Sequence, residues 1–298
     1  MKPAIRITFT DDNGIKFFGE GPCQLLHAVE RTGSLRAAAI SMEMAYSKAM
    51  KLLKQAEGAL GFALTVRSTG GKDGGGSRLT PEAKQFLQQY ETYRDACILE
   101  NQRLFHKMFP RVGCVIMASG LGKRFGSNKL MADFDGQPLI CRALDITEGL
   151  FDTRVVVTRH EDVAQLCRER NISVVLHDLP LRSDTVRLGL EALGDVDGCL
   201  FCPGDQPLLK KETLSSLLGC WKNQQEQIWR PVFEETPGTP VLFPQWTFPE
   251  LRSLPEGKGG GWVIRNHPEK VSHLPISDPW ELTDADTPEI LATLLQHL

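Results

Sequence analysis

The strongest constraint on the fold of this chain is a change of pattern at Pro110. Residues 81–109 have apolar side chains at helical spacing, whereas the apolar run VGCVIM (112–117) is typical of a buried strand. A proline after a helical stretch marks a helix end, and 298 residues suffice for two domains. We therefore expect an N-terminal domain over residues 1–109 and a C-terminal domain over residues 110–298.

The composition is that of an ordinary globular protein, with 41% hydrophobic and 24% charged residues. The formal net charge of -3 excludes a basic field over the whole chain. No apolar run is long enough to span a membrane, and the charged start lacks the apolar core of a signal peptide. We expect a cytoplasmic protein with no membrane partner. Its cysteines are then free thiols, and the CxxC pair Cys199 and Cys202 is read as buried strand thiols rather than a zinc or redox site.

The first domain combines a hairpin, helices and a second hairpin. Strand-like runs flank the turn residues Asn13-Gly14. Helical spacing then extends over residues 21–61 and is broken at residues 32–34, where Ser34 is a good N-cap. Helix, turn and helix in this order indicate a helix-turn-helix. Residues 62–80 follow as strand, glycine-rich loop and strand.

The helix expected over residues 81–109 carries an apolar stripe. Its members lie near one face: Phe86, Tyr90, Tyr93, Cys97, Leu104 and Met108. Such a stripe favours a homodimer seam, but packing against its own domain explains it equally well.

Residues 1–109 resemble the winged helix-turn-helix domain of molybdate-responsive transcription regulators. The matching segments are GPCQLLHAVERTGSLRAAA, MAYSKAMKLL and TGGKDGGGSRLTPEA. The resemblance implies dimeric DNA binding, with a recognition helix in the major groove and a wing on the phosphates. The residues that it assigns to DNA are Ser34, Tyr46, Ser47, Lys48, Lys51, Arg67, Lys72 and Arg78. Glu43 precedes the recognition helix, and its negative charge would repel the DNA phosphates. The residues after Pro110 do not resemble the molybdate-sensing domain of these regulators.

The second domain alternates short apolar strands with helical stretches. This order predicts an α/β fold with a mainly parallel, Rossmann-like sheet, whose ligands bind at the carboxyl ends of the strands. VIMASGLGKRFGSNKL (115–130) lies at the first such end and is neither a dinucleotide nor a Walker fingerprint. Small residues there leave backbone N–H groups free for phosphate oxygens, and two cations suit a triphosphate: the residues are Ala118, Ser119, Gly120, Gly122, Arg124 and Lys129.

This stretch resembles the signature LAAGxSxRMGxxK of nucleotidyltransferases that make molybdopterin dinucleotides and sugar nucleotides. Ser119 replaces the second alanine, close to the nucleotide base in that family, and Gly122 replaces the serine. Further segments match in order: LMADFDGQPLICRAL, RSDTVRLGL, FCPGDQPLL, PGTPVLFP and TDADTPEIL. The C-terminal domain is thus similar to a molybdenum cofactor cytidylyltransferase.

The resemblance implies a set of site residues. Arg182 and Thr185 would contact the nucleotide, and Asp205 would hold magnesium with a second carboxylate from Asp284 or Asp286. Mg²⁺ prefers one or two carboxylates plus phosphate oxygens and would neutralise the reacting phosphates. We favour Asp284, because Asp286 could equally cap the helix after it. Arg124, Lys129 and Asp205 are the expected catalytic residues.

One segment departs from the cytidylyltransferase pattern. EGKGGG (256–261) replaces GDxGxR, so that Gly257 stands for the Asp and Gly261 for the Arg. Residues 259–261 could still bind phosphate with Lys258, and the acceptor could differ from ordinary molybdopterin.

The leading hypothesis is an Mg²⁺-dependent nucleotidyltransferase that moves CMP from CTP to a molybdopterin-type phosphate and releases pyrophosphate. GTP remains an alternative nucleotide, and a molybdoenzyme or its chaperone is a further expected partner. One alternative is a transcription regulator whose transferase-like half senses nucleotide or cofactor. Another is a cytidylyltransferase for a different phosphorylated acceptor.

Overall fold

The computed structural model describes residues 2–68, 76–120, 122 and 125–298, with only the backbone of residues 67 and 68. The chain divides into two compact units, Met1–Phe105 and His106–Leu298. The division falls one turn before the end of α4 (Pro81–Met108). Within the second unit, the His106 ring nitrogen Nδ1 lies 2.7 Å from the Asp197 carboxylate, which holds that last turn.

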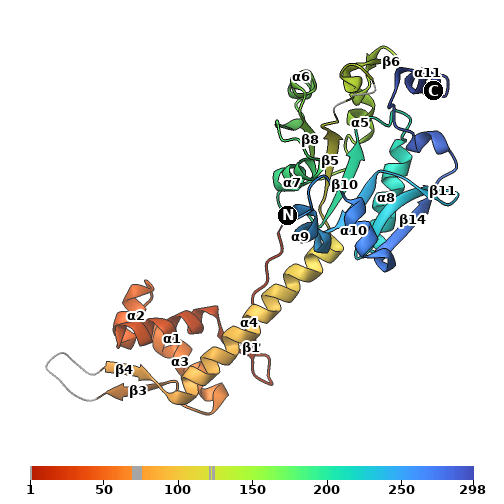
Figure 1. Cartoon of the computed structure of the whole chain (residues 1–298). Coiled ribbons are helices and arrows are strands. Elements are labelled where there is room, and N and C mark those ends of the chain that lie inside the picture. The colour runs from red at the N-terminus through yellow and green to blue at the C-terminus, as the bar shows by residue number, and fades with distance from the viewer. Residues whose placement is uncertain (1, 69–75, 121, 123–124) are drawn as a thin grey trace. The chain divides into compact units, whose positions relative to one another are not determined.

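The N-terminal unit is a winged helix-turn-helix, as predicted (Figure 1). Gly33, at a φ of 69°, ends α1, and the Ser34 hydroxyl accepts the Ala37 N–H at the start of α2, as its N-cap pattern predicts. The elements before α4 are β1 (Thr8–Thr10), β2 (Lys16–Gly19), α1 (Glu20–Thr32), α2 (Leu35–Ser41), α3 (Tyr46–Leu60), β3 (Thr65–Ser68) and β4 (Gly76–Leu79).

Helix α4 is apolar on one side, but only its first half is covered within the N-terminal unit. Leu87 and Tyr90 are buried in the core of this unit, and the Tyr90 and Phe18 rings meet edge to face at 4.9 Å. Farther along, Tyr93 and Leu104 are exposed. Packing on its own domain is therefore confirmed for the start of the stripe, and dimerisation through the rest stays a prediction. No helix among the described residues is long and apolar enough to cross a membrane.

The C-terminal unit is built on a mainly parallel sheet, as predicted, in the order β12-β11-β13-β10-β5-β8-β9, with β14 beside β11. β5 runs parallel to both β10 and β8. The strands are β5 (Val112–Ala118), β8 (Thr153–Thr158), β9 (Ser173–Leu176), β10 (Gly198–Pro203), β11 (Ile228–Phe233), β12 (Thr236–Pro237), β13 (Val241–Pro244) and β14 (Val271–Pro275). A separate small hairpin is formed by β6 (Asp133–Phe134) and β7 (Gln137–Pro138).

Helices cover both faces of this sheet. One face packs against α5 (Ile140–Ile146), α6 (Glu161–Glu169) and α8 (Lys211–Asn223). The other packs against α7 (Arg182–Leu193), α9 (Phe248–Arg252) and α10 (Gly261–Asn266). The chain also contains α11 (Pro288–Leu295) and the short 3-10 helices η1 (Lys129–Met131), η2 (Gln245–Thr247), η3 (Pro268–Lys270) and η4 (Pro279–Leu282).

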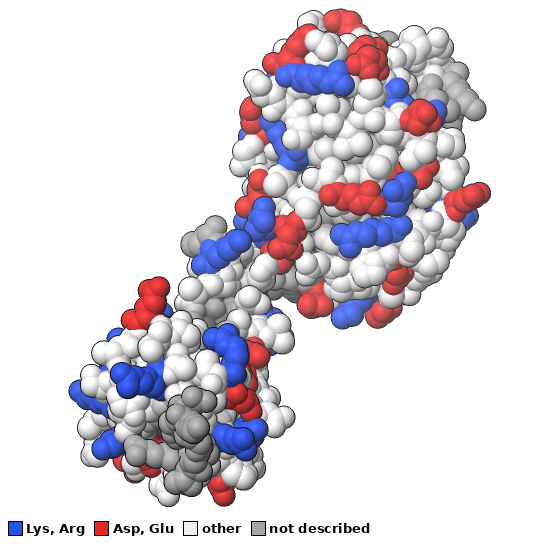
Figure 2. Space-filling model, turned by 90° about the vertical axis from the view of Figure 1, so that its left-hand side faces the viewer, with Lys and Arg blue, Asp and Glu red and all other residues white. Residues whose placement is uncertain are grey.

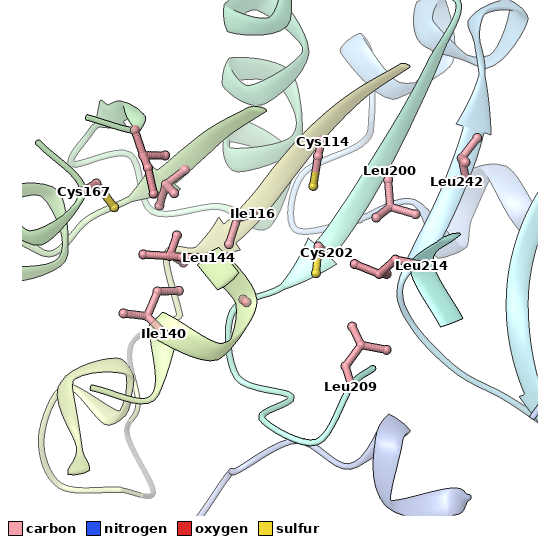
Figure 3. Close-up of a cluster of buried hydrophobic side chains, with 14 of the residues drawn as sticks. Cys114, Ile116, Ile140, Leu144, Cys167, Leu200, Cys202, Leu209, Leu214 and Leu242 are labelled. Atoms are coloured by element: carbon pink, nitrogen blue, oxygen red, sulfur yellow. The ribbon is translucent and has the colours of Figure 1, made fainter. Parts of the chain in front are cut away.

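Strand alternation assigns neighbouring apolar side chains to opposite faces of the sheet. Ile116 and Cys202 lie with Leu144 on the α5 face (Figure 3). Cys199 lies in the core under α7. Because Cys199 and Cys202 point to opposite faces and both are fully buried free thiols, they cannot share a metal. The interpretation as buried strand thiols is confirmed, and burial raises the pKa of Cys202 to about 12.

This burial predicts which thiols react. Cys97 and Cys220 are half-buried, so they should react first with a thiol reagent in the native protein. Replacing both with serine should remove the fast phase of a DTNB time course. Cys199 and Cys202 should react only after unfolding in guanidinium, and rapid labelling of either in the native protein would contradict the structure.

Candidate active site

A cavity of about 650 Å³ opens at the carboxyl ends of β5 and β10. This is the edge at which parallel sheets bind ligands. The predicted site residues among its lining are Ser119, Gly120, Gly122, Lys129, Arg182, Thr185, Asp205, Asp284 and Asp286. These residues come from five separate segments, and the fold brings them together around one cavity.

The loop after β5 forms one wall of the cavity. Gly122 has a φ of 56°, and a Cβ there would lie 2.7 Å from the Ser127 carbonyl oxygen, so this position requires glycine. The Gly120 carbonyl accepts a hydrogen bond from His160. Ala118 is the buried last residue of β5 and does not line the cavity. Arg124 lies outside the described residues.

Ser119 has a partner that sequence reasoning missed. Its hydroxyl donates to the Val157 carbonyl at 3.1 Å and lies 2.8 Å from Nε2 of His177, which directly follows β9. Burial, followed by the charge of Arg159, lowers the pKa of His177, which favours a neutral ring at pH 7. The signal in the sequence was a histidine at a strand's carboxyl end.

Three carboxylates and one ammonium form the polar end of the cavity. The carboxylate oxygens of Asp205, Asp284 and Asp286 all lie within 4.8 Å of one another. The Lys129 Nζ lies 2.5 Å from Asp205 and 2.8 Å from Asp286. Asp286 therefore faces the site, and the N-cap of α11 is Thr287, whose hydroxyl accepts the Ile290 N–H. The alternative reading of Asp286 as the helix cap is wrong.

The carboxylates of this cluster stabilise the charged form of Lys129. Burial lowers the pKa of Lys129, but Asp205 and Asp286 raise it by more, so the net shift is upward and the ammonium stays charged. Burial, followed by the charge of Asp205, raises the pKa of Asp284. Three carboxylates against one ammonium leave an excess of negative charge, and an all-oxygen donor set suits magnesium or manganese. The residues present therefore fit a divalent cation.

Gln206 positions the acidic residues, and sequence reasoning missed it. Only 2% of its surface is exposed, and its Nε2 lies 2.9 Å from Asp284 and 2.8 Å from the Thr239 hydroxyl. The Asp205 carbonyl accepts the Ala285 N–H at 2.8 Å. These bonds tie the end of β10 to the segment before α11. A polar residue between Gly-Asp and Pro at a buried strand end was the only signal.

The first turn of α7 lines the cavity together with the end of the glycine segment of residues 257–261. Thr185 is buried and Arg182 is exposed. A Cβ on Gly259 would lie 3.1 Å from the Arg182 guanidinium nitrogen Nε, so the two segments are in contact. Gly260 and Gly261 line the cavity. Gly261, which stands for the Arg of the family pattern, thus lies at the site, whereas Gly257, which stands for the Asp, is not among the residues that line the cavity.

The residues assigned to DNA lie on the helix-turn-helix and its wing. Tyr46, Ser47, Lys48 and Lys51 are exposed in the first two turns of α3, and Ser34 is half-buried as the cap of α2. Arg78 is exposed on β4; the Arg67 side chain and Lys72 lie outside the described residues. Lys and Arg side chains are spread across the face of this unit that Figure 2 shows. Glu43 is exposed between α2 and α3, at a φ of 52°.

Comparison with known proteins defines the family. The MobA-like NTP transferase domain matches residues 114–274, more than half of the chain, and the chain belongs to this family. The helix-turn-helix of bacterial regulatory proteins of the lysR family matches residues 23–84. The protein is thus a nucleotidyltransferase-family enzyme domain, similar to cytidylyltransferases, joined to a helix-turn-helix.

Individual relatives match parts of the chain. A 2-C-methyl-D-erythritol 4-phosphate cytidylyltransferase from Dehalococcoides mccartyi is 33% identical over 113 residues, which are 35% of this chain and 50% of that protein. The molybdenum transport protein ModE from Herbaspirillum seropedicae is 44% identical over 63 residues, 21% of this chain and 23% of that protein. The chain spans half the length of the first relative and less of the second.

A solved structure shows the same fold for the C-terminal unit. Rv0371c from Mycobacterium tuberculosis H37Rv, in complex with manganese, aligns with a TM-score of 0.53 at 21% identity and covers 63% of this chain and 100% of that chain.

Asp284→Asn should separate stability from metal binding. A carboxyl with a raised folded-state pKa stabilises the fold in acid, and this contribution is lost as the pH rises through that pKa. Without added metal, the variant should therefore melt at a higher temperature than wild type at pH 7, with the difference vanishing below about pH 4. It should bind Mn²⁺ at least about tenfold more weakly by calorimetry at pH 7.

The matched control is Asp278→Asn, which removes the ion pair with Lys210 that lowers the pKa of Asp278. This variant should lose stability at pH 7 and bind Mn²⁺ as wild type does. Unchanged Mn²⁺ affinity in Asp284→Asn would exclude this carboxylate as a ligand.

Proposed function

We propose that the C-terminal unit is an Mg²⁺-dependent cytidylyltransferase that transfers CMP from CTP to a molybdopterin-type phosphate. The observation that carries this proposal is the cluster of Asp205, Asp284 and Asp286 around Lys129, at the carboxyl ends of two parallel strands, beside a glycine-containing loop. A triphosphate needs such a combination of divalent cation, fixed positive charge and free backbone N–H groups.

The reaction is a displacement at phosphorus. An oxygen of the acceptor phosphate forms a bond to the α-phosphorus of CTP, and the bond from that phosphorus to the α,β-bridging oxygen breaks. Pyrophosphate leaves with the electron pair, and no general base is needed because the acceptor phosphate is already ionised. Magnesium held by Asp205 and Asp284 or Asp286 would neutralise the charge of the reacting phosphates.

Side chains of the cavity then have distinct roles in this proposal. The backbone of residues 119–122 binds phosphate oxygens, and Lys129 keeps two carboxylates in place while offering its charge to the nucleotide. Arg124, beyond the described residues, adds a second cation for the triphosphate. Arg182 and Thr185 contact the nucleotide from α7.

The choice of CTP rests on the relatives. The segment RSDTVRLGL of α7 resembles the cytidylyltransferase element, and a curated relative of the C-terminal unit is a cytidylyltransferase. The acceptor is inferred from both halves: the family of the C-terminal unit is MobA-like, and a relative of the N-terminal unit is a molybdenum transport protein. A manganese complex in the same fold supports a divalent cation.

The N-terminal unit is proposed to bind DNA as a homodimer. The first turns of α3 are exposed and carry Lys48 and Lys51, as a recognition helix requires. Coupling of the two activities would let the state of cofactor synthesis control transcription. We place both activities in the cytoplasm, where a molybdoenzyme or its chaperone would receive the product.

A nucleotide sensor without transferase activity is the second candidate. It is favoured by the segment of residues 257–261, which has glycines where the family has Asp and Arg and which lines the cavity with Gly260 and Gly261. A cytidylyltransferase for a different phosphorylated acceptor would explain the same glycine replacements in residues 257–261.

Pyrophosphate release tests the enzyme directly. With Mg²⁺ and molybdopterin, the full chain should release pyrophosphate from CTP faster than from GTP, and EDTA should stop the reaction. Asp205→Asn should lower the rate at least about a hundredfold, because a metal contributes several kcal/mol to the reaction. Asp278→Asn is the matched control and should retain the rate.

The outcomes separate the candidates. Binding of CTP without pyrophosphate release from any acceptor would contradict the enzyme and favour the sensor. Release of pyrophosphate with CTP and a sugar or alcohol phosphate, but not with molybdopterin, would contradict molybdopterin as the acceptor and identify the enzyme as a cytidylyltransferase for that other phosphate.

DNA binding is tested by salt dependence. Lys48→Ala and Lys51→Ala should each weaken binding to duplex DNA and reduce the slope of log affinity against log salt by about one, as loss of a phosphate contact does. Fluorescence anisotropy at several salt concentrations measures this. Lys222→Ala on α8 is the control, and equal effects of all three substitutions would refute α3 as the DNA-contacting helix.

A further inference from the structure

A second group of metal-ligating side chains lies in the N-terminal unit, apart from the carboxylate cluster. Cys23 and His27 are four residues apart on α1, so they project from the same face of that helix. Glu91 of α4 lies opposite them. The Cys23 sulfur, a His27 ring nitrogen and a Glu91 carboxylate oxygen all lie within 4.8 Å of one another.

The group has one buried and two accessible members. Cys23 is 1% exposed and belongs to the core between α1 and α4. The side chains of His27 and Glu91 are 48% and 32% exposed, and Nε2 of His27 lies 2.8 Å from the Glu91 carboxylate. An ion from solvent can therefore contact His27 and Glu91, which lie beside the buried sulfur.

The spacing suits a small tetrahedral ion. Zinc binds sulfur at about 2.3 Å and nitrogen or oxygen at about 2.0–2.2 Å, which places tetrahedral ligand atoms roughly 3.5 Å apart. The three atoms here need only side-chain adjustment to reach that spacing, since His27 and Glu91 are at hydrogen-bond distance and the sulfur lies within 4.8 Å of both.

One further charged side chain, Arg94, contacts the sulfur of Cys23. The Arg94 guanidinium lies 4.0 Å from the sulfur, but it also pairs with Glu20 at 3.3 Å and with Asp95 at 3.0 Å. Its charge is thus balanced by its own carboxylates. A thiolate, a carboxylate and a neutral imidazole together balance one divalent ion.

We propose that Cys23, His27 and Glu91 form a binding site for a thiophilic divalent transition metal of the zinc class, with water as the remaining ligand. Binding replaces the thiol proton of Cys23 by a metal–sulfur bond and releases that proton to solvent. Sulfur and imidazole ligands select zinc-like ions over magnesium, so this site and the three carboxylates of the other unit bind different metals.

The site links the two helices that frame the helix-turn-helix. Cys23 and His27 hold the metal from α1, and Glu91 holds it from α4, which begins directly after the wing. Metal binding therefore stabilises the packing of α1 on α4 and makes the stability of the DNA-binding unit depend on metal concentration.

Cobalt is the probe that separates the two metal sites. Co²⁺ added to the full chain should produce a thiolate-to-cobalt charge-transfer band in the near ultraviolet, and Zn²⁺ should displace it. The carboxylate cluster contains no sulfur and is silent in this band, so Asp205→Asn should retain it. The result is thus independent of whether the C-terminal unit is a transferase.

Substitutions assign the ligands. Cys23→Ser should abolish the band, and His27→Gln and Glu91→Gln should each weaken Co²⁺ binding at least about tenfold. Cys97→Ser, on the same helix as Glu91, and Cys220→Ser are the matched controls and should keep the band. Because His27 is exposed, its substitution leaves the fold intact and remains informative if Cys23→Ser does not fold.

Two results would overturn the proposal. One is the absence of a thiolate band in the wild-type chain with excess Co²⁺, which would leave His27 and Glu91 as an ordinary ion pair beside a core thiol. The other is a band that survives Cys23→Ser or is lost in either cysteine control.

Discussion

The C-terminal site depends on Lys129, the buried ammonium held between Asp205 and Asp286. Three carboxylates gathered within 4.8 Å would repel each other without a positive charge. Lys129 supplies that charge from η1, and the upward shift of its pKa keeps it ionised. This one interaction joins the segment after the glycine loop, the end of β10 and the segment before α11. The cavity holds its shape because these three segments share one network of charges.

The two units follow different physical strategies. In the C-terminal unit, a buried parallel sheet presents its polar groups only where strands end, so chemistry concentrates at one edge. In the N-terminal unit, a small helical core leaves the first turns of α3 exposed, as recognition of an extended polyanion requires. The chain thus joins a nucleotidyltransferase-family domain to a helix-turn-helix.

Much of this architecture could be predicted from the sequence, because its signals are local. The Asn13-Gly14 turn, the Ser34 cap and the strand at residues 112–118 each depend on a few neighbouring residues. The long-range contacts could not be predicted. The motifs place Lys129 and Asp286 at one site, but they do not indicate that these residues, 157 positions apart, form an ion pair, or that Gln206 reaches Asp284.

Other residues lie elsewhere than the sequence predicted because tertiary packing determines their position. Ala118 fits the nucleotide-loop motif, but as the last residue of β5 it is buried in the core. Thr287 caps α11 in place of Asp286, because Asp286 pairs with Lys129. The role of His177 could not be predicted, because a single histidine after a strand gives no sign of its hydrogen-bond partner, Ser119.

We propose that the carboxylate cluster binds a metal and a nucleotide together. A crystal structure of the chain grown with Mn²⁺ and a non-hydrolysable CTP analogue tests it most directly, through the anomalous signal of manganese. We expect a manganese peak beside Asp205 and Asp284 or Asp286, with the triphosphate against the backbone of residues 119–122. A manganese peak or nucleotide bound elsewhere, with this cluster unchanged around Lys129, would contradict it.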